Sequence, residues 1–178
     1  MDDLKEERIK NMKRIILHWT AGTYFPNQDE KAHYHYLIEY DKQHRAANVK
    51  NGICKPEDNL NCYDGKYAAH TGGGNTGSIG IALCGNAGFK SPSNQGKYPL
   101  QKIQFEKMFK LCAELCKKYA IVISPITVLT HYEFGIQNPK TESKGKPDIN
   151  FIPYEPNLAA HGVGDYIRGK VQWYLERL

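Results

Sequence analysis

The chain has 178 residues, of which 40% are apolar and 24% are charged, and its formal net charge is +5. This size predicts a single domain spanning residues 1–178, and the composition is ordinary for a soluble globular protein. No apolar run approaches the roughly 20 residues that cross a bilayer, so no stable association with a membrane is expected. The opening MDDLKEERIKNMKR lacks the apolar centre of a secretory signal, so we expect the protein to be cytoplasmic as synthesised.

The basic residues are scattered along the chain rather than clustered. A mild positive field suits an anionic polymer such as nucleic acid or bacterial cell wall. No helix-turn-helix, RNP or zinc-finger pattern supports a nucleic-acid partner. The five cysteines, an odd number without a signal peptide, argue against a disulfide framework. Cys112 and Cys116 have the spacing of core residues on a helix, whereas the redox state of Cys54 and Cys62, which flank a polar loop, stays open.

The predicted elements mix strands with helices. Residues 1–12 are expected to form a charged N-terminal extension with a short helix. Segments rich in strand formers predict strands at 14–19, 33–40, 44–49, 78–85 and 126–131. Apolar residues at helical spacing predict one helix over 101–119 and a C-terminal helix within 161–178, which Asp165 is expected to cap. The fold class is therefore α/β (α+β), with a single mixed β-sheet flanked by helices.

Candidate metal ligands stand at or beyond the predicted strand ends. His18 ends the first strand, His131 ends the last, and Asp148 closes a long polar loop. Two imidazoles and one carboxylate make a three-ligand zinc set that leaves a fourth position for water. These residues are far apart in sequence, so spacing alone leaves open that they are ordinary core or surface residues.

The stretch HTGGGNTG, from His70 to Gly77, contains the letters GxGxxG. The segment that follows it, SIGIALCG, is typical of a strand rather than of a helix whose N-terminus binds phosphate. We therefore do not expect a dinucleotide site here. The glycines are better explained by a sharp turn or by a backbone that lies close to a ligand.

Strand alternation makes a prediction about the aromatic segment at 34–36. It places Tyr34 and Tyr36 on one face of the predicted strand and His35 on the other. A half-buried aromatic strand explains this pattern, and so does a tyrosine that points into the metal pocket.

The motifs ILHWTAG, HYHYLI, AAHTGGGNTGSIGIALCG, LTHYEF and KGKPD occur in this order. The chain thereby resembles the zinc-dependent N-acetylmuramoyl-L-alanine amidases, a superfamily that includes T7-lysozyme-like enzymes, muropeptide-recycling amidases and peptidoglycan recognition proteins. The resemblance covers residues 18–148. It implies the fold of that superfamily and a hydrolase that cleaves the amide bond between N-acetylmuramic acid and L-alanine. The implied partners are peptidoglycan or muropeptide fragments.

The resemblance also implies one zinc ion with His18, His131 and Asp148 as its ligands. Lys146 matches the lysine that stabilises the oxyanion in these enzymes. Alternation places Lys146 and Asp148 on one face of an extended segment, a conformation that Pro147 favours at the residue before it.

Further residues of the site follow from the same resemblance. Tyr34 is similar to the active-site tyrosine of the T7-like branch. His70 matches a pocket histidine that shapes the substrate groove. We also expect Thr71 and His35 to bind substrate.

The sequence departs from the family pattern in several places. Ala82 stands where the recycling branch carries a glutamate. Residues 20–33 leave almost no room for the helix that many members place there. The loop at 132–145 is longer than in compact members, and its role stays open.

These features favour a phage or prophage endolysin that acts as a monomer and reaches the wall by an external route. The alternatives are a cytoplasmic recycling amidase and a non-catalytic peptidoglycan-binding module. The sequence leaves open the stem-peptide specificity and the group that gives a proton to the departing amine.

Overall fold

The structure is a computed structural model that describes residues 11–178. The predicted N-terminal extension and its short helix therefore lie almost entirely outside the described residues. Met12, at the end of that extension, is only 4% exposed and belongs to the hydrophobic core.

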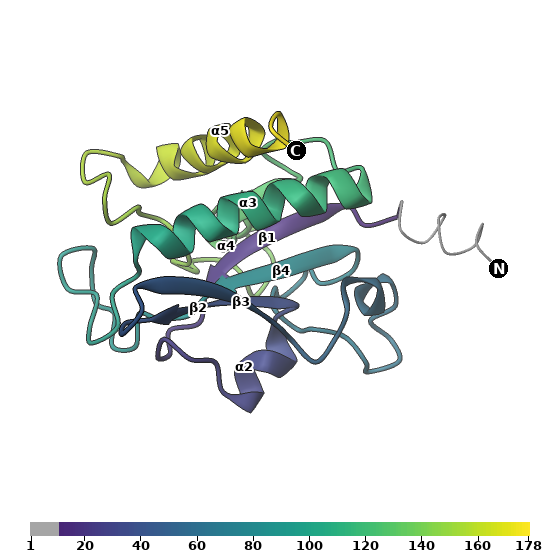
Figure 1. Cartoon of the computed structure of the whole chain (residues 1–178). Coiled ribbons are helices and arrows are strands. Elements are labelled where there is room, and N and C mark those ends of the chain that lie inside the picture. Colours follow the sequence, from purple (N-terminus) through teal and green to yellow (C-terminus); the bar gives the residue numbers. More distant parts are fainter. Residues whose placement is uncertain (1–10) are drawn as a thin grey trace.

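Within residues 11–178, five strands form one mixed sheet in the order β3-β2-β4-β1-β5 (Figure 1). The strands are β1 (Arg14–Trp19), β2 (Tyr36–Asp41), β3 (Ala46–Asn51), β4 (Ser78–Leu83) and β5 (Val128–Thr130). β1, β2, β4 and β5 run parallel, and β3 pairs antiparallel with β2. The predicted mixed sheet and its predicted strands are confirmed, with shifted ends.

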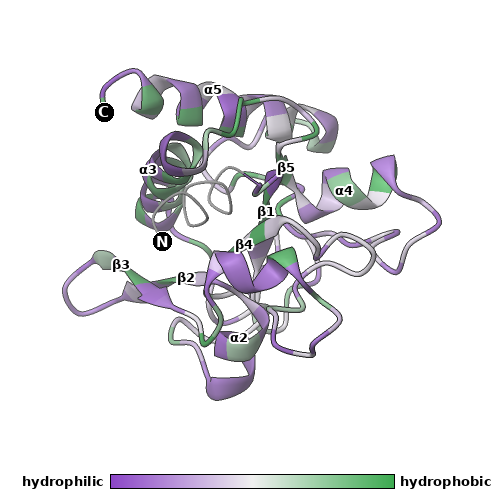
Figure 2. Cartoon of the chain, turned by 90° about the vertical axis from the view of Figure 1, so that its right-hand side faces the viewer, coloured by the Kyte–Doolittle hydropathy of each residue, from purple (hydrophilic) through white to green (hydrophobic). Residues whose placement is uncertain are grey.

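The helices lie on both sides of this sheet (Figure 2). On one side lie α3 (Lys102–Tyr119) and α5 (Val163–Leu175), and on the other lie the shorter α2 (Gln28–His33) and α4 (His131–Gln137). Short 3-10 turns are η1 (Pro56–Leu60) and η2 (Ala160–Gly162). None of the helices in the described part of the chain has the length and apolar content to span a membrane.

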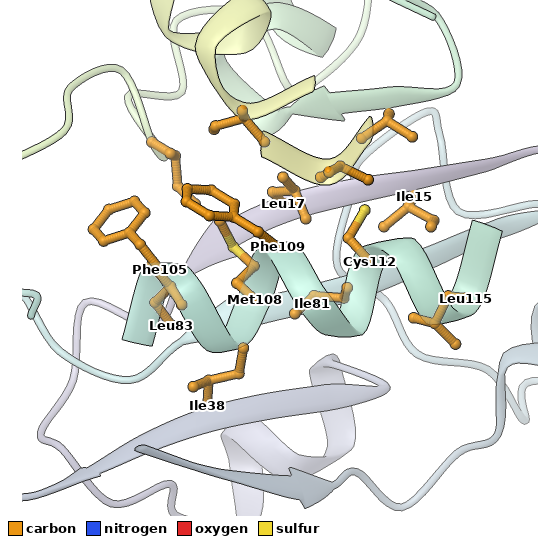
Figure 3. Packing of buried hydrophobic residues seen from close by; sticks show 14 of the residues in the cluster. Ile15, Leu17, Ile38, Ile81, Leu83, Phe105, Met108, Phe109, Cys112 and Leu115 are labelled. Carbon is orange, nitrogen blue, oxygen red and sulfur yellow. The ribbon is translucent and has the colours of Figure 1, made fainter. Parts of the chain in front are cut away.

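The two faces of β1 have different surroundings. Ile15, Leu17 and Trp19 join the main core, which lies between the sheet and the helices α3 and α5 (Figure 3). Ile16 belongs instead to a small cluster with Phe134 of α4. Because side chains alternate along a strand, His18 lies on the same face as Ile16. The large apolar core thus occupies one face, and the other face is free to hold polar groups.

The helix α4 begins where the sequence predicted the end of a strand. His131 is the first residue of this helix and not the last residue of β5. The Thr130 hydroxyl accepts a hydrogen bond from the Glu133 backbone N–H (3.1 Å), and the Glu133 carboxylate accepts one from the Thr130 N–H (3.0 Å). This capping box starts the helix inside the predicted long loop.

The short helix α2 fills the segment that was predicted to have almost no room for one. Asn27 and Glu30 form a capping box of the same kind, with bonds of 2.8 and 2.9 Å. At the C-terminal end of the chain, Gly162 and not Asp165 is the N-cap of α5. Ile167 and Val171, on the apolar face of this helix, are buried.

Cys112 and Cys116 are buried on α3, as predicted, and Cys54 and Cys62 are free thiols.

Gln104 joins α3 to the sheet. Its side chain is fully buried, and its Nε2 donates hydrogen bonds to the carbonyl oxygens of Ile38 and Cys84, both at 2.9 Å. Its Oε1 accepts from the Gln101 N–H at 2.9 Å. Every polar atom of this buried amide therefore has a partner.

Gln104→Met should lower the free energy of unfolding by about 2–4 kcal/mol, because it leaves the buried Cys84 carbonyl oxygen and the Gln101 N–H without partners. The Ile38 carbonyl oxygen keeps its hydrogen bond from the Cys84 N–H (3.0 Å). Gln172→Met, an exposed position on α5, should stay within about 0.5 kcal/mol of the parent. Urea unfolding of both variants measures this, and equal effects would contradict the assigned role of Gln104.

Candidate metal centre

Three side chains from separate elements converge at the C-terminal end of β1. They are His18 of β1, His131 at the start of α4, and Asp148 in the turn that follows the long loop. The Nδ1 atoms of the two histidines are 3.1 Å apart. Oδ2 of Asp148 lies 3.4 Å from Nδ1 of His18 and 3.3 Å from Nδ1 of His131. The structure thus brings together the three predicted ligands.

This triangle has the dimensions of a zinc site. Ligands placed tetrahedrally at 2.0–2.1 Å from zinc are about 3.3 Å from one another, and the three observed separations are 3.1–3.4 Å. His18 is fully buried and His131 is 5% exposed, whereas the Asp148 side chain keeps 13% of its surface exposed. The residues therefore fit a metal ion that retains one position for water or substrate.

Ser143 sets the tautomer of His131. Nε2 of His131 lies 2.9 Å from Oγ of Ser143, and this hydroxyl donates its own hydrogen to the Gly72 carbonyl oxygen at 2.8 Å. The hydroxyl therefore accepts from Nε2–H of His131. The Nδ1 atom is left unprotonated, with its lone pair toward the centre, which is the form that binds metal.

His70 does the same for His18. Nε2 of His70 is 3.3 Å from the Ser78 carbonyl oxygen, which only accepts, so this nitrogen carries the hydrogen. Nδ1 of His70 then accepts from Nε2–H of His18 at 3.1 Å. A Cβ atom on Gly80 would lie 2.5 Å from the His70 ring, so only glycine leaves room for it. His70 therefore contacts the Nε2 side of the His18 ring, and the Nδ1 side of that ring faces the other two ligands.

The charges of the group follow from burial. Burial lowers the pKa of His18 to about 4, although Asp148 acts in the opposite direction. Burial also holds the pKa of His70 well below its usual value. Burial alone would raise the pKa of Asp148, but the imidazole groups of His131 and His18 outweigh it and hold this pKa well below its usual range. At pH 7 the group thus has neutral His18 and ionised Asp148.

The structure places Tyr34 next to the metal group. Its ring centroid is 5.2 Å from that of His18. Tyr34 is the C-cap of α2 and does not belong to β2, whereas Tyr36 packs on the main core beneath α3. The prediction that both tyrosines share a strand face was therefore wrong, because strand alternation begins only after Tyr34. Burial, with added effects of Asp148 and Glu30, raises the pKa of Tyr34 and keeps its phenol protonated.

His35 and Thr71 lie deeper in the protein. Nδ1 of His35 accepts from the Gly80 N–H at 2.9 Å, so its Nε2–H donates to Oδ1 of Asn59 at 3.0 Å. His35 and Thr71 are each 1% exposed, and the Thr71 hydroxyl is 2.8 Å from Nδ1 of His70. The His35 ring meets that of His70 edge-on at a centroid distance of 5.5 Å. The predicted contacts of His35 and Thr71 with substrate stay predictions.

The HTGGGNTG stretch leads into β4 and not into a helix, which agrees with the prediction that it is not a dinucleotide site. Gly73 in this stretch has a φ of 78°, as the predicted sharp turn requires.

Lys146 and Asp148 do not lie on a regular extended segment. Asp148 is part of a turn closed by a 3.0 Å hydrogen bond from the Asn150 N–H to the Pro147 carbonyl oxygen. Ile149 in this turn has a φ of 58°, an unfavourable region for a β-branched residue, and its complete burial holds it there. Lys146 is exposed. Its predicted role thus rests on the resemblance and not on strand alternation.

An ion-pair cluster that the sequence analysis missed fixes the start of α4. The Arg168 guanidinium donates to the two carboxylate oxygens of Glu133 at 2.9 and 3.1 Å, and also to the Val128 carbonyl oxygen at 2.9 Å. Glu133 belongs to the capping box that begins with Thr130. The T-x-x-E spacing was a readable signal for this helix start, whereas no local pattern marks Arg168 or Ser143.

The chain was compared with curated proteins, solved structures and family models. No curated protein matches the chain. Among solved structures, one of a mutant of PlyL matches with a TM-score of 0.49 and 19% identity, covering 91% of this chain and 85% of that one.

A family model described as N-acetylmuramoyl-L-alanine amidase matches residues 8–147, which is most of the chain. This match includes His18, His131 and Lys146, and it ends one residue before Asp148. The chain therefore belongs to the N-acetylmuramoyl-L-alanine amidase family.

Proposed function

We propose that the protein is a zinc-dependent hydrolase that cleaves the amide bond between N-acetylmuramic acid and L-alanine in peptidoglycan. The family membership supports an amidase acting on peptidoglycan. The finer assignment rests on one observation, the convergence of the ligand atoms of His18, His131 and Asp148 within 3.4 Å. When bound at these residues, a zinc ion supplies Lewis-acid catalysis and activates water at neutral pH.

The protein's own groups handle the charge that develops on the substrate carbonyl oxygen. Lys146 is exposed and lies two residues before Asp148, and we assign its ammonium group as a donor to this oxygen on the basis of the family resemblance. Tyr34 beside His18 offers a protonated phenol as a second donor. Donors of this kind stabilise an oxyanion most effectively in a site that excludes water.

Of the two biological settings, we propose the lytic one, in which the enzyme acts on the intact wall after release from the cytoplasm as a phage or prophage endolysin. Ala82 supports this choice. It pairs in register with His18 and is fully buried, so the position where the recycling branch carries a glutamate adjoins the metal group and holds no carboxylate.

The zinc-loaded protein should release stem peptides that begin with L-alanine from intact sacculi. Mass spectrometry of the products tests this, with soluble anhydro-muropeptides as a second substrate. Cleavage of the soluble fragments alone would instead indicate a recycling amidase. Retention of sacculi without any cleavage would contradict the proposal and indicate a binding module.

Lys146→Ala should lower kcat by roughly 10²–10³-fold, because it removes an oxyanion donor. Zinc content and unfolding free energy should not change. Lys144→Ala, at an exposed position two residues earlier, is the matched control. Wild-type rates for the Lys146 variant would show that the lysine has no catalytic role.

Ser143→Ala should weaken zinc binding by roughly 10–100-fold, because Nε2–H of His131 loses its acceptor. Competition with a chromogenic chelator measures this affinity without any enzyme assay. Ser91→Ala, whose hydroxyl contacts only the neighbouring Ser93 hydroxyl among described side chains, should bind zinc as the parent does. Unchanged affinity in the Ser143 variant would refute its supporting role.

A further inference from the structure

Basic residues that are scattered in the sequence meet at a cavity of about 430 Å³ between β3 and α3. Arg45 comes from the turn that joins β2 to β3. Lys107 and Lys110 come from α3, which packs against β3 (Figure 1). All three residues are exposed. The cavity therefore has three cationic groups that a ligand from solution can reach.

The positive charge of this cavity is not neutralised by the fold. None of its three cations lies within 4.0 Å of a carboxylate oxygen among residues 11–178. The carboxylate in the lining, Glu106, has other partners. Its Oε2 accepts a hydrogen bond from the Tyr174 hydroxyl at 2.7 Å, and its Oε1 lies 3.9 Å from Nζ of Lys170. Such a concave group of cations with one sign of charge attracts an anion.

Arg45 has a backbone conformation that favours other residue types. Its φ of 49° lies in the left-handed region, which glycine and asparagine adopt most readily. The turn itself is closed by another side chain, because the Asp41 carboxylate accepts from the N–H groups of Gln43 and His44 at 2.9 and 3.1 Å. Strained residues that the surrounding structure does not require are candidates for a role in binding. This conformation is an observation independent of the charges.

The rest of the lining selects among anions. Ile103, which is 42% exposed, and Ala46 give the cavity an aliphatic surface beside the cations. The ring in the lining, Tyr174, is not fully exposed and its hydroxyl is bonded to Glu106, so it is a poor platform for the stacked bases of a single strand. The apolar face of α3 is buried in the main core and cannot insert into a bilayer. A phosphate ester joined to aliphatic carbons fits these walls.

We propose that this cavity binds the phosphate groups of an anionic cell-wall polymer, a chain of polyol units joined by phosphodiesters. The Arg45 guanidinium and the two lysines of α3 donate hydrogen bonds to the phosphate oxygens. The choice of a wall polymer rests on the proposed function.

The site is separate from the metal group. In the sheet order, β3 is three strands from β1, which is about 14 Å at the usual spacing between strands. In addition, α3 covers the face of the sheet opposite to His18 (Figure 2). The cavity therefore takes no part in cleavage, and it holds the enzyme on the wall while the metal group acts.

Arg45→Asn separates a binding role from a structural one. Asparagine tolerates the left-handed conformation, so the unfolding free energy should not fall. Calorimetric titration with poly(glycerol phosphate) should give a Kd about tenfold higher than that of the parent, the size expected for one lost charge-assisted hydrogen bond. A variant that is less stable but keeps the parent's Kd would show that Arg45 serves the turn, and it would overturn the proposal.

Two double variants of α3 separate the site from the net charge of the protein. Lys107→Gln/Lys110→Gln should raise this Kd at least tenfold and make its dependence on salt concentration less steep. Lys117→Gln/Lys118→Gln is the matched control, because it changes the charge equally at exposed positions about 15 Å further along the same helix. The control should bind as the parent does. Equal weakening in both variants would show that only net charge matters and that the cavity is not a site.

Other anions identify the ligand. Inorganic phosphate, a DNA duplex and anionic phospholipid vesicles should each bind more weakly than poly(glycerol phosphate) at the same phosphate concentration. Inorganic phosphate that binds as well as the polymer would reveal a site for small anions. Tighter binding of DNA or vesicles, with the same loss in Arg45→Asn, would assign the cavity to that partner. Each of these results would refute the wall polymer as the ligand.

Cleavage of two kinds of wall separates this proposal from the proposed function. On walls that carry the phosphodiester polymer, Arg45→Asn should raise KM about tenfold and leave kcat unchanged. On walls from which acid has removed the polymer, parent and variant should have the same KM. Polymer binding by a protein that releases no stem peptide would refute the hydrolase and keep the site. Normal cleavage without polymer binding would refute the site alone.

Discussion

The structure depends on a contact that is unfavourable without a cation. The Nδ1 lone pairs of His18 and His131 lie 3.1 Å apart, and the Asp148 carboxylate is within 3.4 Å of both. His70 holds His18 in place, and Ser143 holds His131 in place, each through a hydrogen bond to Nε2. The turn at 147–150 positions Asp148. These supports fix the tautomers and directions of the ligands before a metal binds, so the binding free energy is not spent on ordering them.

The rest of the fold explains how such a polar group is tolerated. The main apolar core lies between the sheet and the helices α3 and α5, on the face of β1 opposite to His18. Burial of that face stabilises the domain. Gln104 and Arg168 join helices to the sheet through side-chain hydrogen bonds to backbone carbonyl oxygens. The other face can therefore hold four buried histidines, His18, His35, His70 and His131. Ile149, which follows Asp148 directly, also lies at this end of the sheet. Its strained backbone conformation occurs where the chain turns away from the preceding loop.

Much of this fold could be predicted from the sequence. The strands and α3 could be predicted because the strands consist of runs of strand formers and α3 has apolar residues at helical spacing. The helices α2 and α4 were missed because each is short and is set by a capping box, N-x-x-E in one case and T-x-x-E in the other. The three ligands come from positions 18, 131 and 148, so only the resemblance grouped them before the structure did. Ser143 and Arg168 form hydrogen bonds with residues that are distant in sequence. No local sequence pattern predicts such contacts.

A titration of metal-free protein with zinc, with amide cleavage in sacculi as the readout, tests whether the site holds a catalytic metal. Activity should rise linearly and stop at one equivalent of zinc per chain, and His131→Ala should abolish this rise. If activity were already complete in the metal-free protein, or did not depend on the amount of zinc bound, His18, His131 and Asp148 would not hold a catalytic metal.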